Sequence, residues 1–159
     1  ALPVTQFDEA LKRFAKQMLD TMYDSMGIGL AANQVGVLQQ VVVMDIHSGQ
    51  SELPPKSWVF VNPSIESKKG EVISEEGCLS VVDFRAEVKR AESMVLKYQD
   101  LEGKEQQEAF DGLEAICIQH ELDHLFGKLY VDRIKDITKL TYSEEYQEFL
   151  RVPCWSRLQ

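Results

Sequence analysis

The chain has 159 residues, of which 44% are apolar and 27% are charged, a composition typical of one globular domain. Its formal net charge of −9 argues against broad nucleic-acid binding, because a phosphate surface is bound through an excess of cationic contacts. No apolar run approaches the ~20 residues that span a bilayer, and no signal peptide is recognisable. The three cysteines form no disulfide framework, so we expect a reducing compartment.

The first predicted element is an amphipathic helix between Thr5 and Gly27. Thr5 and Asp8 form a pair that resembles a capping box, and apolar residues then recur every three or four positions up to Met26. The methionines of this stripe, Met26 included, are expected to fill the core. Gly27 would end the helix.

Short runs of β-branched, aromatic or alternating residues then predict strands separated by turn signals. These strands are expected at 40–46, 58–62, 71–73, 85–90, 94–99 and 105–110. A surface loop is expected at 51–56 and a turn at 100–103. Asp111 can cap a second helix that runs to about Leu125, and a last helix is expected near 143–151.

The second predicted helix is apolar around most of its circumference, so we expect it to be central and buried. The predicted fold class is therefore α+β. Antiparallel β-sheets would pack around this central helix, which carries a candidate metal site, and an amphipathic helix would stand at the N-terminal end. Residues 1–159 are expected to form a single domain.

The candidate metal site is the motif QHELDH at residues 119–124, which contains two of the three histidines of the chain. His120 and His124 share one helix face about 6 Å apart, so both imidazoles can bind one tetrahedral ion. Glu121 is rotated by about 100° and can reach a water molecule on that ion. The motif also arises by chance on helices, but burying two histidines without partners would be unfavourable.

Two histidines leave a tetrahedral site in need of a third protein ligand. No histidine follows His124, and the first acidic residues downstream, Asp132 and Asp136, stand at unsuitable spacings. Upstream lies the segment EGCLS at 76–80, in which Cys78 offers a thiolate, a good ligand for zinc or ferrous iron. Gly77 lets the backbone come close to the ion. Alternatively, Cys78 is a buried free thiol, which its acidic, glycine-containing surroundings disfavour.

A third motif, GIGLAANQ at 27–34, combines small residues with a glutamine. Gly27 and Gly29 would expose backbone N–H and C=O groups with which an extended peptide can pair. The Gln34 side chain can donate its NH₂ group to an oxyanion without adding charge. Read alone, the segment could equally be a packing seam of small residues beside a helix end. It lacks the pattern of a nucleotide-binding loop.

The three motifs, in this order and at these spacings, resemble the signatures of the peptide deformylase family. The resemblance covers about residues 5–135. It implies an α+β fold that agrees with the one expected from the sequence pattern. It also implies a metal-dependent hydrolase that removes the N-terminal formyl group from formylmethionyl nascent peptides and releases formate.

The resemblance further implies a role for each matching residue of the motifs. The ion and a water molecule would be held by Cys78, His120 and His124. Glu121 would take the proton of that water and later deliver it to the departing amine. The oxyanion would be held by the ion and by two donors, the Gln34 side chain and the Leu79 backbone N–H.

Substrate-binding residues are transferred in the same way, position by position. The methionine pocket would be lined by Ile28, Leu113, Ile116 and Cys117. The three helix residues lie one and two turns before His120 on the same side, although plain core packing explains them equally well. Gly29 and Gly77 would pair with the peptide backbone. Arg85 would contact the peptide too, unless it forms a surface ion pair.

One divalent metal ion is expected as the cofactor. A Cys/His/His ligand set suits Zn²⁺, which binds more tightly than Fe²⁺ in the general affinity order. The resemblance points instead to labile Fe²⁺ in cells, with Zn²⁺, Ni²⁺ or Co²⁺ able to replace it in the isolated protein.

A formylmethionyl peptide is the expected partner, without a membrane and without direct nucleic-acid binding, and we expect a monomer. Residues 135–159 carry equal numbers of basic and acidic side chains. Ribosome docking through this C-terminal tail is therefore not expected, because binding to a phosphate-rich surface depends on net cationic contacts. The expected compartment is the cytoplasm, for a bacterial or phage-encoded protein, or else an organellar matrix or stroma.

Two other functions remain open on the sequence alone. A peptidase with the same helix motif would need a third His or Glu ligand, and none is well placed. A non-catalytic protein stabilised by a metal would need neither Glu121 nor Gln34.

Overall fold

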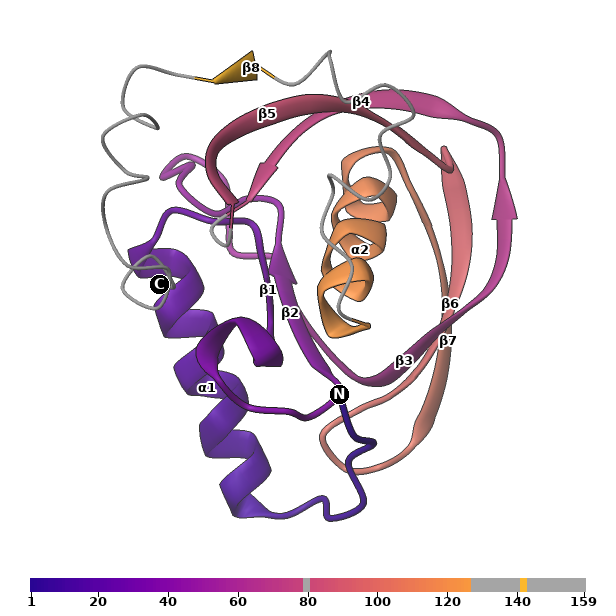
Figure 1. The fold of residues 1–159 in the computed structure, drawn as a ribbon. Coiled ribbons are helices and arrows are strands. Elements are labelled where there is room, and N and C mark those ends of the chain that lie inside the picture. Colours follow the sequence, from indigo (N-terminus) through magenta and orange to yellow (C-terminus); the bar gives the residue numbers. More distant parts are fainter. Residues whose placement is uncertain (79–80, 127–140, 143–159) are drawn as a thin grey trace.

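The computed structural model describes the backbone of residues 1–78, 81–126 and 141–142, and the side chains of 1–75 and 87–126. The fold is α+β, as the sequence predicts (Figure 1). Its elements are α1 (Glu9–Asp24), β1 (Gly29–Ala31), the 3-10 helix η1 (Ala32–Val35), β2 (Val41–Asp45), β3 (Ser57–Lys69), β4 (Val72–Cys78), β5 (Val81–Arg90), β6 (Ser93–Gln99), β7 (Glu105–Asp111), α2 (Gly112–Leu125) and β8 (Thr141–Tyr142). The helix predicted near 143–151 lies outside the described residues.

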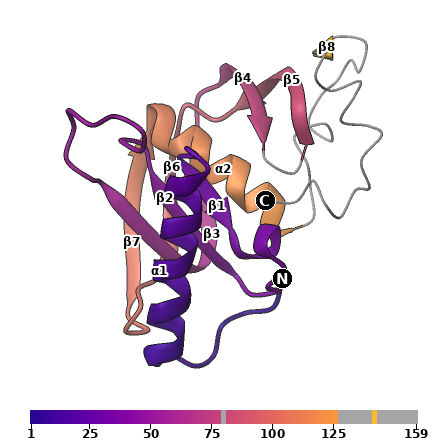
Figure 2. The ribbon, with the colours of Figure 1, turned by 90° about the vertical axis from the view of Figure 1, so that its left-hand side faces the viewer.

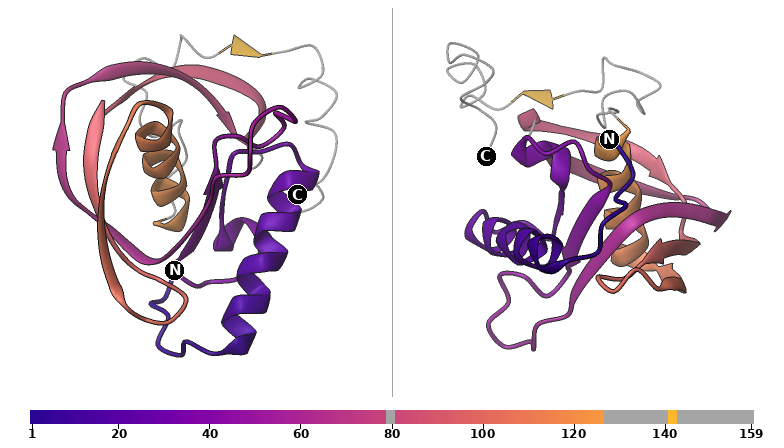
Figure 3. Two further views of the ribbon diagram at one scale, coloured as in Figure 1. Left: turned by 180° about the vertical axis from the view of Figure 1, so that it is seen from behind. Right: turned by 90° about the horizontal axis from the view of Figure 1, so that it is seen from below.

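The strands form two antiparallel sheets that enclose α2. One sheet has the order β1-β2-β3-β6-β7 and the other the order β4-β5-β8. Figure 1 shows α2 between the sheets, and Figure 2 shows α1 lying across β1 and β2. Seen from below in Figure 3, α1 and α2 lie on opposite sides of these two strands. Neither described helix has the length and apolar character that a membrane span requires.

The alternation of side chains along β2 supplies two apolar cores. Val42 faces α2 and belongs to a buried cluster with Ile118 and Leu122. Its neighbour Val43 faces the other way and packs against Met22 of α1. Because successive strand residues point to opposite faces, one short strand anchors both helices.

The start of α1 differs from the prediction. The sequence pattern places it at Thr5, but the helix begins at Glu9, after the N-cap Asp8. The Asp8 carboxylate accepts a hydrogen bond of 3.0 Å from the Leu11 N–H. Aspartate caps at least as well as threonine, so one residue closes the first turn without the predicted pair.

The C-terminal end of α1 closes in a Schellman motif. Gly27 N–H donates to the Met22 carbonyl at 2.9 Å, and Met26 N–H donates to the Tyr23 carbonyl at 3.0 Å. Met26 has a φ of 57° and therefore occupies the left-handed position that glycine usually fills. The expectation that Met26 fills the core is wrong, since it is 76% exposed, whereas Met22 is fully buried.

Strands β3, β4 and β5 are all longer than the sequence pattern predicts. β3 continues beyond Asn62, whose positive φ accompanies a shift in register with β6. β4 and β5 continue through the cysteine motif as one hairpin, in which Cys78 pairs with Val81. The added residues of β3 and β4 show no apolar alternation that a pattern search could find. In β5, by contrast, Phe84, Ala86 and Val88 alternate with polar residues, a signal of a longer strand that the prediction does not include.

Asp45, buried at the end of β2, ties α1 to the sheet. Its Oδ2 accepts hydrogen bonds from the Tyr23 hydroxyl at 2.6 Å and from the Lys56 N–H at 3.1 Å. Burial, and then the Asp45 carboxylate, raise the pKa of Tyr23 to about 12. The fold therefore favours the neutral phenol.

The Tyr23–Asp45 contact should weaken at high pH. A raised pKa means that the stabilising contribution of Tyr23 is complete below its ordinary value of 10.0 and is lost as pH rises toward about 12. Urea unfolding of the wild-type chain and of Tyr23→Phe should show a constant difference in unfolding free energy below pH ~10 that then shifts against the wild type. A difference that stays constant to pH ~12 would contradict this assignment.

Candidate active site

Helix α2 is the central buried helix that the sequence predicts, and four of its polar side chains are buried with its apolar ones. The buried polar residues are Gln119, Glu121, Asp123 and His124. Burial of polar and charged groups is unfavourable unless each finds a partner or an ion. The partners of these side chains therefore indicate what the helix does.

The two histidines of α2 converge, as their spacing predicts. The Nε2 atoms of His120 and His124 lie 3.1 Å apart, and the ring centroids are 4.8 Å apart. Two nitrogen ligands at about 2.0–2.1 Å from a tetrahedral ion stand roughly 3.4 Å from each other, so the pair fits one shared cation. Two neutral imidazoles whose lone pairs face each other would repel without a proton or a cation between them.

Glu121 lies beside this pair. Its Oε1 is 4.0 Å from the His120 Nε2, and its side chain is 6% exposed. One ligand atom from each of His120, Glu121 and His124 lies within 4.8 Å of the others, a grouping that can hold a metal ion. A buried carboxylate next to a cation site is well placed to exchange a proton with a water molecule there.

Gly29 allows β1 to approach α2 at this point. A Cβ at this position would stand 2.7 Å from the Cys117 Sγ and 3.0 Å from the Glu121 Cγ. The first distance is shorter than real Cβ contacts and the second is at their tight limit, so any other residue would require the Cys117 and Glu121 side chains to shift. The sequence predicts that Gly29 frees backbone for a peptide, and the structure adds this steric requirement.

The short helix η1 brings amide side chains to the same end of α2. The Gln34 Oε1 accepts a hydrogen bond of 2.9 Å from the Ala31 N–H, and Gln34 is 8% exposed. This bond fixes the side chain with its oxygen engaged, so that the NH₂ group is its donor. The Asn33 side-chain NH₂ donates to the His124 carbonyl and so holds the end of α2 against η1.

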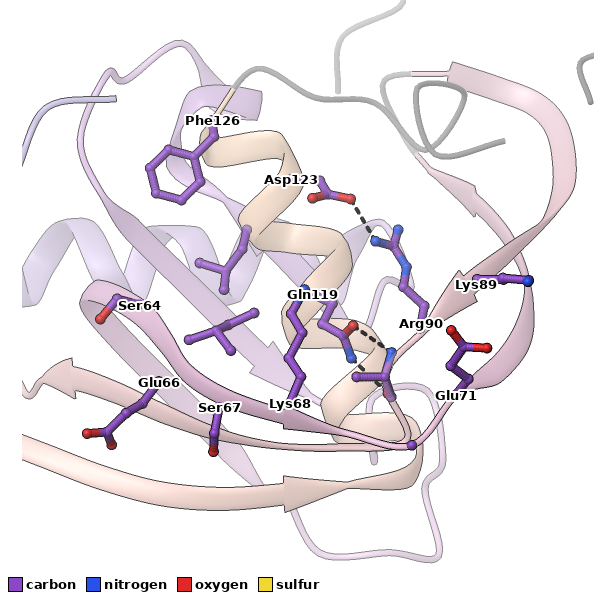
Figure 4. Close-up of a pocket in the computed structure, with 14 residues that line it drawn as sticks. Ser64, Glu66, Ser67, Lys68, Glu71, Lys89, Arg90, Gln119, Asp123 and Phe126 are labelled. Carbon is purple, nitrogen blue, oxygen red and sulfur yellow. Dashed lines mark hydrogen bonds and ion pairs between the residues drawn. The ribbon is translucent and has the colours of Figure 1, made fainter. Parts of the chain in front are cut away.

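Gln119 and Asp123 hold the helix from its other side, as Figure 4 shows. Gln119 Nε2 donates to the Ala91 carbonyl at 2.9 Å and Gln119 Oε1 accepts from the Ala91 N–H at 2.9 Å. Arg90 Nη1 donates to Asp123 Oδ2 at 2.6 Å, with side chains only 4% and 9% exposed. These contacts form the floor of a cavity of about 660 Å³ that also contacts Phe126.

This Arg90–Asp123 and Ala91–Gln119 clamp connects α2 to the end of β5. The same hairpin carries Cys78 at the end of β4. The backbone of Gly77 lies where the β4–β5 register shifts, between the pairs Glu76–Ala86 and Cys78–Val81. Leu79 lies outside the described residues, as do the side chains of Cys78 and Arg85.

The residues expected to line a methionine pocket lie together only in part. Cys117 is buried, and its Sγ is 3.7 Å from the Ile28 carbonyl oxygen, so β1 and α2 meet there. Ile116 and Ile28 are half-buried, and Leu113 is 50% exposed at the first turn of α2. The structure thus brings Ile28 and Cys117 together and leaves Leu113 at the surface, and the methionine pocket stays a prediction.

Comparison with known proteins identifies the family. The model of the polypeptide deformylase family matches residues 1–140. The chain belongs to this family. Peptide deformylase from Alkalilimnicola ehrlichii is 42% identical over 95% of this chain and 83% of its own.

Solved structures agree with this family membership. Peptide deformylase from Synechococcus elongatus, in complex with actinonin, has a TM-score of 0.81 at 42% identity, over 87% of this chain and 75% of its own. A class I type b peptide deformylase from Acinetobacter baumannii, bound to Met-Ala-Ser, has a TM-score of 0.77 at 37% identity, over 84% of this chain and 89% of its own.

The function follows from membership in the family. The chain is a metal-dependent hydrolase that removes the N-terminal formyl group from nascent peptides. The peptidase and the non-catalytic metal protein, which the sequence alone leaves open, are thereby set aside.

The sequence analysis misses the residues that position α2. Gln119 and Asp123 stand four apart inside the same motif as the two histidines, a spacing that places them on a second common face. This regularity is a signal that could have been used. The partners Arg90 and Ala91 carry no such signal, because only the tertiary fold brings the end of β5 to this face.

The clamp should matter for stability. Asp123→Asn keeps the shape of the side chain but removes the charge that faces buried Arg90, and breaking such a pair typically costs about 3–5 kcal/mol. Urea unfolding of the purified variant measures this loss. Asp111→Asn is the matched control at an exposed position without a side-chain cap bond, where a change within about 0.5 kcal/mol is expected. Equal effects in both variants would show that the ion pair is unimportant.

Proposed function

We propose that this deformylase holds one divalent ion with Cys78, His120 and His124 and uses Glu121 as its proton carrier. The observation that carries the proposal is the 3.1 Å approach of the two imidazole Nε2 atoms beside a buried carboxylate. The third ligand, Cys78, is proposed from its motif and from its position at the end of β4. These residues would form a Cys/His/His set on one helix and one hairpin, within a single domain of residues 1–159.

The ion that we propose for cells is Fe²⁺, with Zn²⁺, Ni²⁺ or Co²⁺ able to replace it in isolated protein. A thiolate and two imidazoles are ligands that all these ions accept, and availability then decides which one is bound. When bound, the cation supplies Lewis acidity, which lowers the pKa of a water molecule and polarises a carbonyl oxygen.

Glu121 moves the proton in both halves of the proposed reaction. It accepts a proton from the attacking water, whose oxygen forms a bond to the formyl carbon. The same carboxyl group then donates that proton to the peptide nitrogen as the C–N bond breaks, so that formate and a free amine leave. The burial of Glu121 supports this role, because a carboxylate with little contact with bulk solvent exchanges its proton mainly with the reacting water.

Two donors would stabilise the negative charge that develops on the formyl oxygen. One is the Gln34 side-chain NH₂, which is oriented by the bond between the Ala31 N–H and the Gln34 Oε1. The other is the Leu79 backbone N–H, proposed from the motif. Donors that are fixed before the reaction stabilise such charge without reorganisation.

The peptide would bind along the open edge of β1. Among the described strands, β1 pairs only with β2, so its second edge is available for an added strand. Ile28 and Leu30 direct their backbone groups toward β2, because the Ile28 carbonyl accepts from the Asp45 N–H at 2.8 Å and pairing alternates along the strand. Gly29 therefore presents its N–H and C=O to the open edge, where the methionine residue would pair.

The methionine side chain would point toward α2. Residues opposite each other on neighbouring strands share a face, and the missing Cβ of Gly29 faces Cys117. The pocket would then be formed by Ile28, Leu113, Ile116 and Cys117, with Gly77 and Arg85 contacting the peptide from the hairpin. The Acinetobacter relative, described as bound to Met-Ala-Ser, supports a peptide of this kind.

We further propose that the protein works as a cytoplasmic monomer, or in an organellar matrix or stroma. It would act without direct nucleic-acid binding and without ribosome docking through residues 135–159. The net charge of −9 and the balanced charges of that tail argue against nucleic-acid binding and ribosome docking, because few net cationic contacts are available to a phosphate surface.

Glu121→Gln tests the proton carrier. The amide keeps the shape of the side chain but cannot exchange the proton, so kcat for formate release from formyl-Met-Ala-Ser should fall by about 10²–10⁴-fold with metal content unchanged. Glu114→Gln on the same helix, a residue that contacts Trp58 and Lys56, is the control and should retain turnover. Near-normal kcat in Glu121→Gln would eliminate the proposed mechanism.

Cys78→Ser tests the third ligand. A neutral hydroxyl replaces a thiolate, so the variant should lose most of its metal on dialysis against a chelator that leaves the wild type loaded. Metal content is read by elemental analysis, together with the thiolate-to-metal absorption band of the Co²⁺ form. Cys117→Ser is the matched control and should keep both. If Cys78→Ser retains its metal and its band, the third ligand lies elsewhere.

A further inference from the structure

Met26 combines two unusual properties. It is 76% exposed, more than any other large apolar residue that the structure describes. It also has a φ of 57°, and Asn62 is the only other described non-glycine residue with a positive φ. Asparagine tolerates this conformation, whereas a residue with a long apolar side chain is disfavoured in it.

Stability alone does not account for a methionine at this position. The Schellman bonds from Gly27 and Met26 require a left-handed residue after Ser25, which glycine adopts freely. The side chain also buries little surface in return, unlike Met18 and Met22 on the same helix. An exposed apolar side chain held in a disfavoured backbone conformation is a reason to look for a ligand contact.

We propose that Met26 is a specificity-determining residue that contacts the second residue of the peptide, the one that follows formylmethionine. The contact would favour an apolar side chain at that position, above all an aromatic one. This inference rests on the proposed pairing of the peptide with β1.

The strand register leads to this position. With the formyl group near Gln34 and the methionine opposite Gly29, the peptide runs antiparallel to β1, so its next residue lies opposite Ile28. Successive residues of an extended peptide alternate between faces, so this side chain points away from the methionine and from α2, toward the face that α1 covers, whereas Ile28, which precedes β1, packs on the α2 side. The chain leaves α1 at this face through Met26, two residues before Ile28.

A methionine contact suits a preference for certain side chains at the second peptide position without strict exclusion of the others. The methionine thioether is polarizable and flexible, adapts to side chains of different shape, and makes favourable contacts with aromatic rings. Asp24, exposed at the last position of α1, adds a negative charge near Met26, so an acidic side chain in the peptide would meet repulsion.

The test compares formyl-Met-X-Ser peptides, with X as Phe, Ala or Glu, on the nickel-loaded enzyme. Met26→Gly should lower kcat/KM for the Phe peptide about three- to tenfold, through KM, and leave the Ala peptide within about twofold. Binding of the product peptides Met-Phe-Ser and Met-Ala-Ser, measured by calorimetry, should show the same loss of preference. The thermal midpoint should rise by about 2–4 °C, because glycine relieves the left-handed residue.

Control variants separate this contact from general effects. Met26→Asn, which tolerates the left-handed conformation, should also lose the preference for Phe. Ile73→Asn removes another exposed apolar side chain, at the start of β4. It should change neither the ratio of kcat/KM between the Phe and Ala peptides nor the ratio of the affinities for their product peptides. The peptide formyl-Met-Ala-Phe should be indifferent to Met26→Gly, since its aromatic ring is at the third position.

The possible results are decisive in either direction. If Met26→Gly and Met26→Asn keep the wild-type ratio between the Phe and Ala peptides, the inference is wrong while the proposed function stands. If the change falls on formyl-Met-Ala-Phe instead, the assigned register is wrong. Gly29→Ala keeps the backbone groups but adds a Cβ toward Cys117 and Glu121, so it should lower kcat/KM for all peptides alike, and unchanged values would overturn the close approach of β1 to α2 on which the register rests.

Discussion

The close approach of β1 to α2 at Gly29 is the constraint on which the rest of the site depends. A Cβ there would stand 2.7 Å from the Cys117 Sγ and 3.0 Å from the Glu121 Cγ, so the distance between strand and helix is set by a missing atom. This distance brings η1, which follows β1 directly, to the end of α2, where Asn33 bonds the His124 carbonyl. The oxyanion donor proposed at Gln34 and the base proposed at Glu121 are therefore positioned by the same contact.

The side of α2 that faces the end of β5 also needs fixed contacts, because a helix that is packed on one side only can tilt. The clamp formed by Gln119 with Ala91 and by Asp123 with Arg90 supplies these contacts. It uses buried polar groups, which are directional, whereas apolar packing alone would leave the rotation of the helix loosely defined. If His120 and His124 present their nitrogens to one ion, as proposed, rotation about the helix axis is the freedom that matters most. The two clamp residues on α2, Gln119 and Asp123, directly precede His120 and His124, so the contacts of the clamp also set the orientation of the two histidines.

The sequence predicts those features that depend on local spacing. His120 and His124 converge because they stand four residues apart on one helix. Helix α2 is buried at the centre because apolar residues cover most of its sides. The clamp partners Arg90 and Ala91 escape prediction, because they meet α2 only through the tertiary fold. The hairpin of β4 and β5 is underestimated because β4 shows no side-chain period, although the alternation of Phe84, Ala86 and Val88 in β5 does signal a strand that begins earlier than predicted. Met26 is misjudged because the apolar repeat continues to it, although the helix has already turned into its C-terminal motif.

The steric and the hydrogen-bonding roles of Gly29 are consequences of one geometric fact. In an antiparallel strand, each residue sends its side chain to one face and its backbone groups to one edge. At residue 29 the face is the one that α2 occupies, and the edge is the one that β2 leaves open. The absent Cβ thus admits the catalytic helix, and the exposed N–H and C=O are the groups with which a peptide would pair. A residue with a side chain could still offer the backbone groups, but it would separate them from Glu121. Glycine therefore suits this position, because the proposed peptide-binding edge and the proposed base, Glu121, would have to reach the same formyl group.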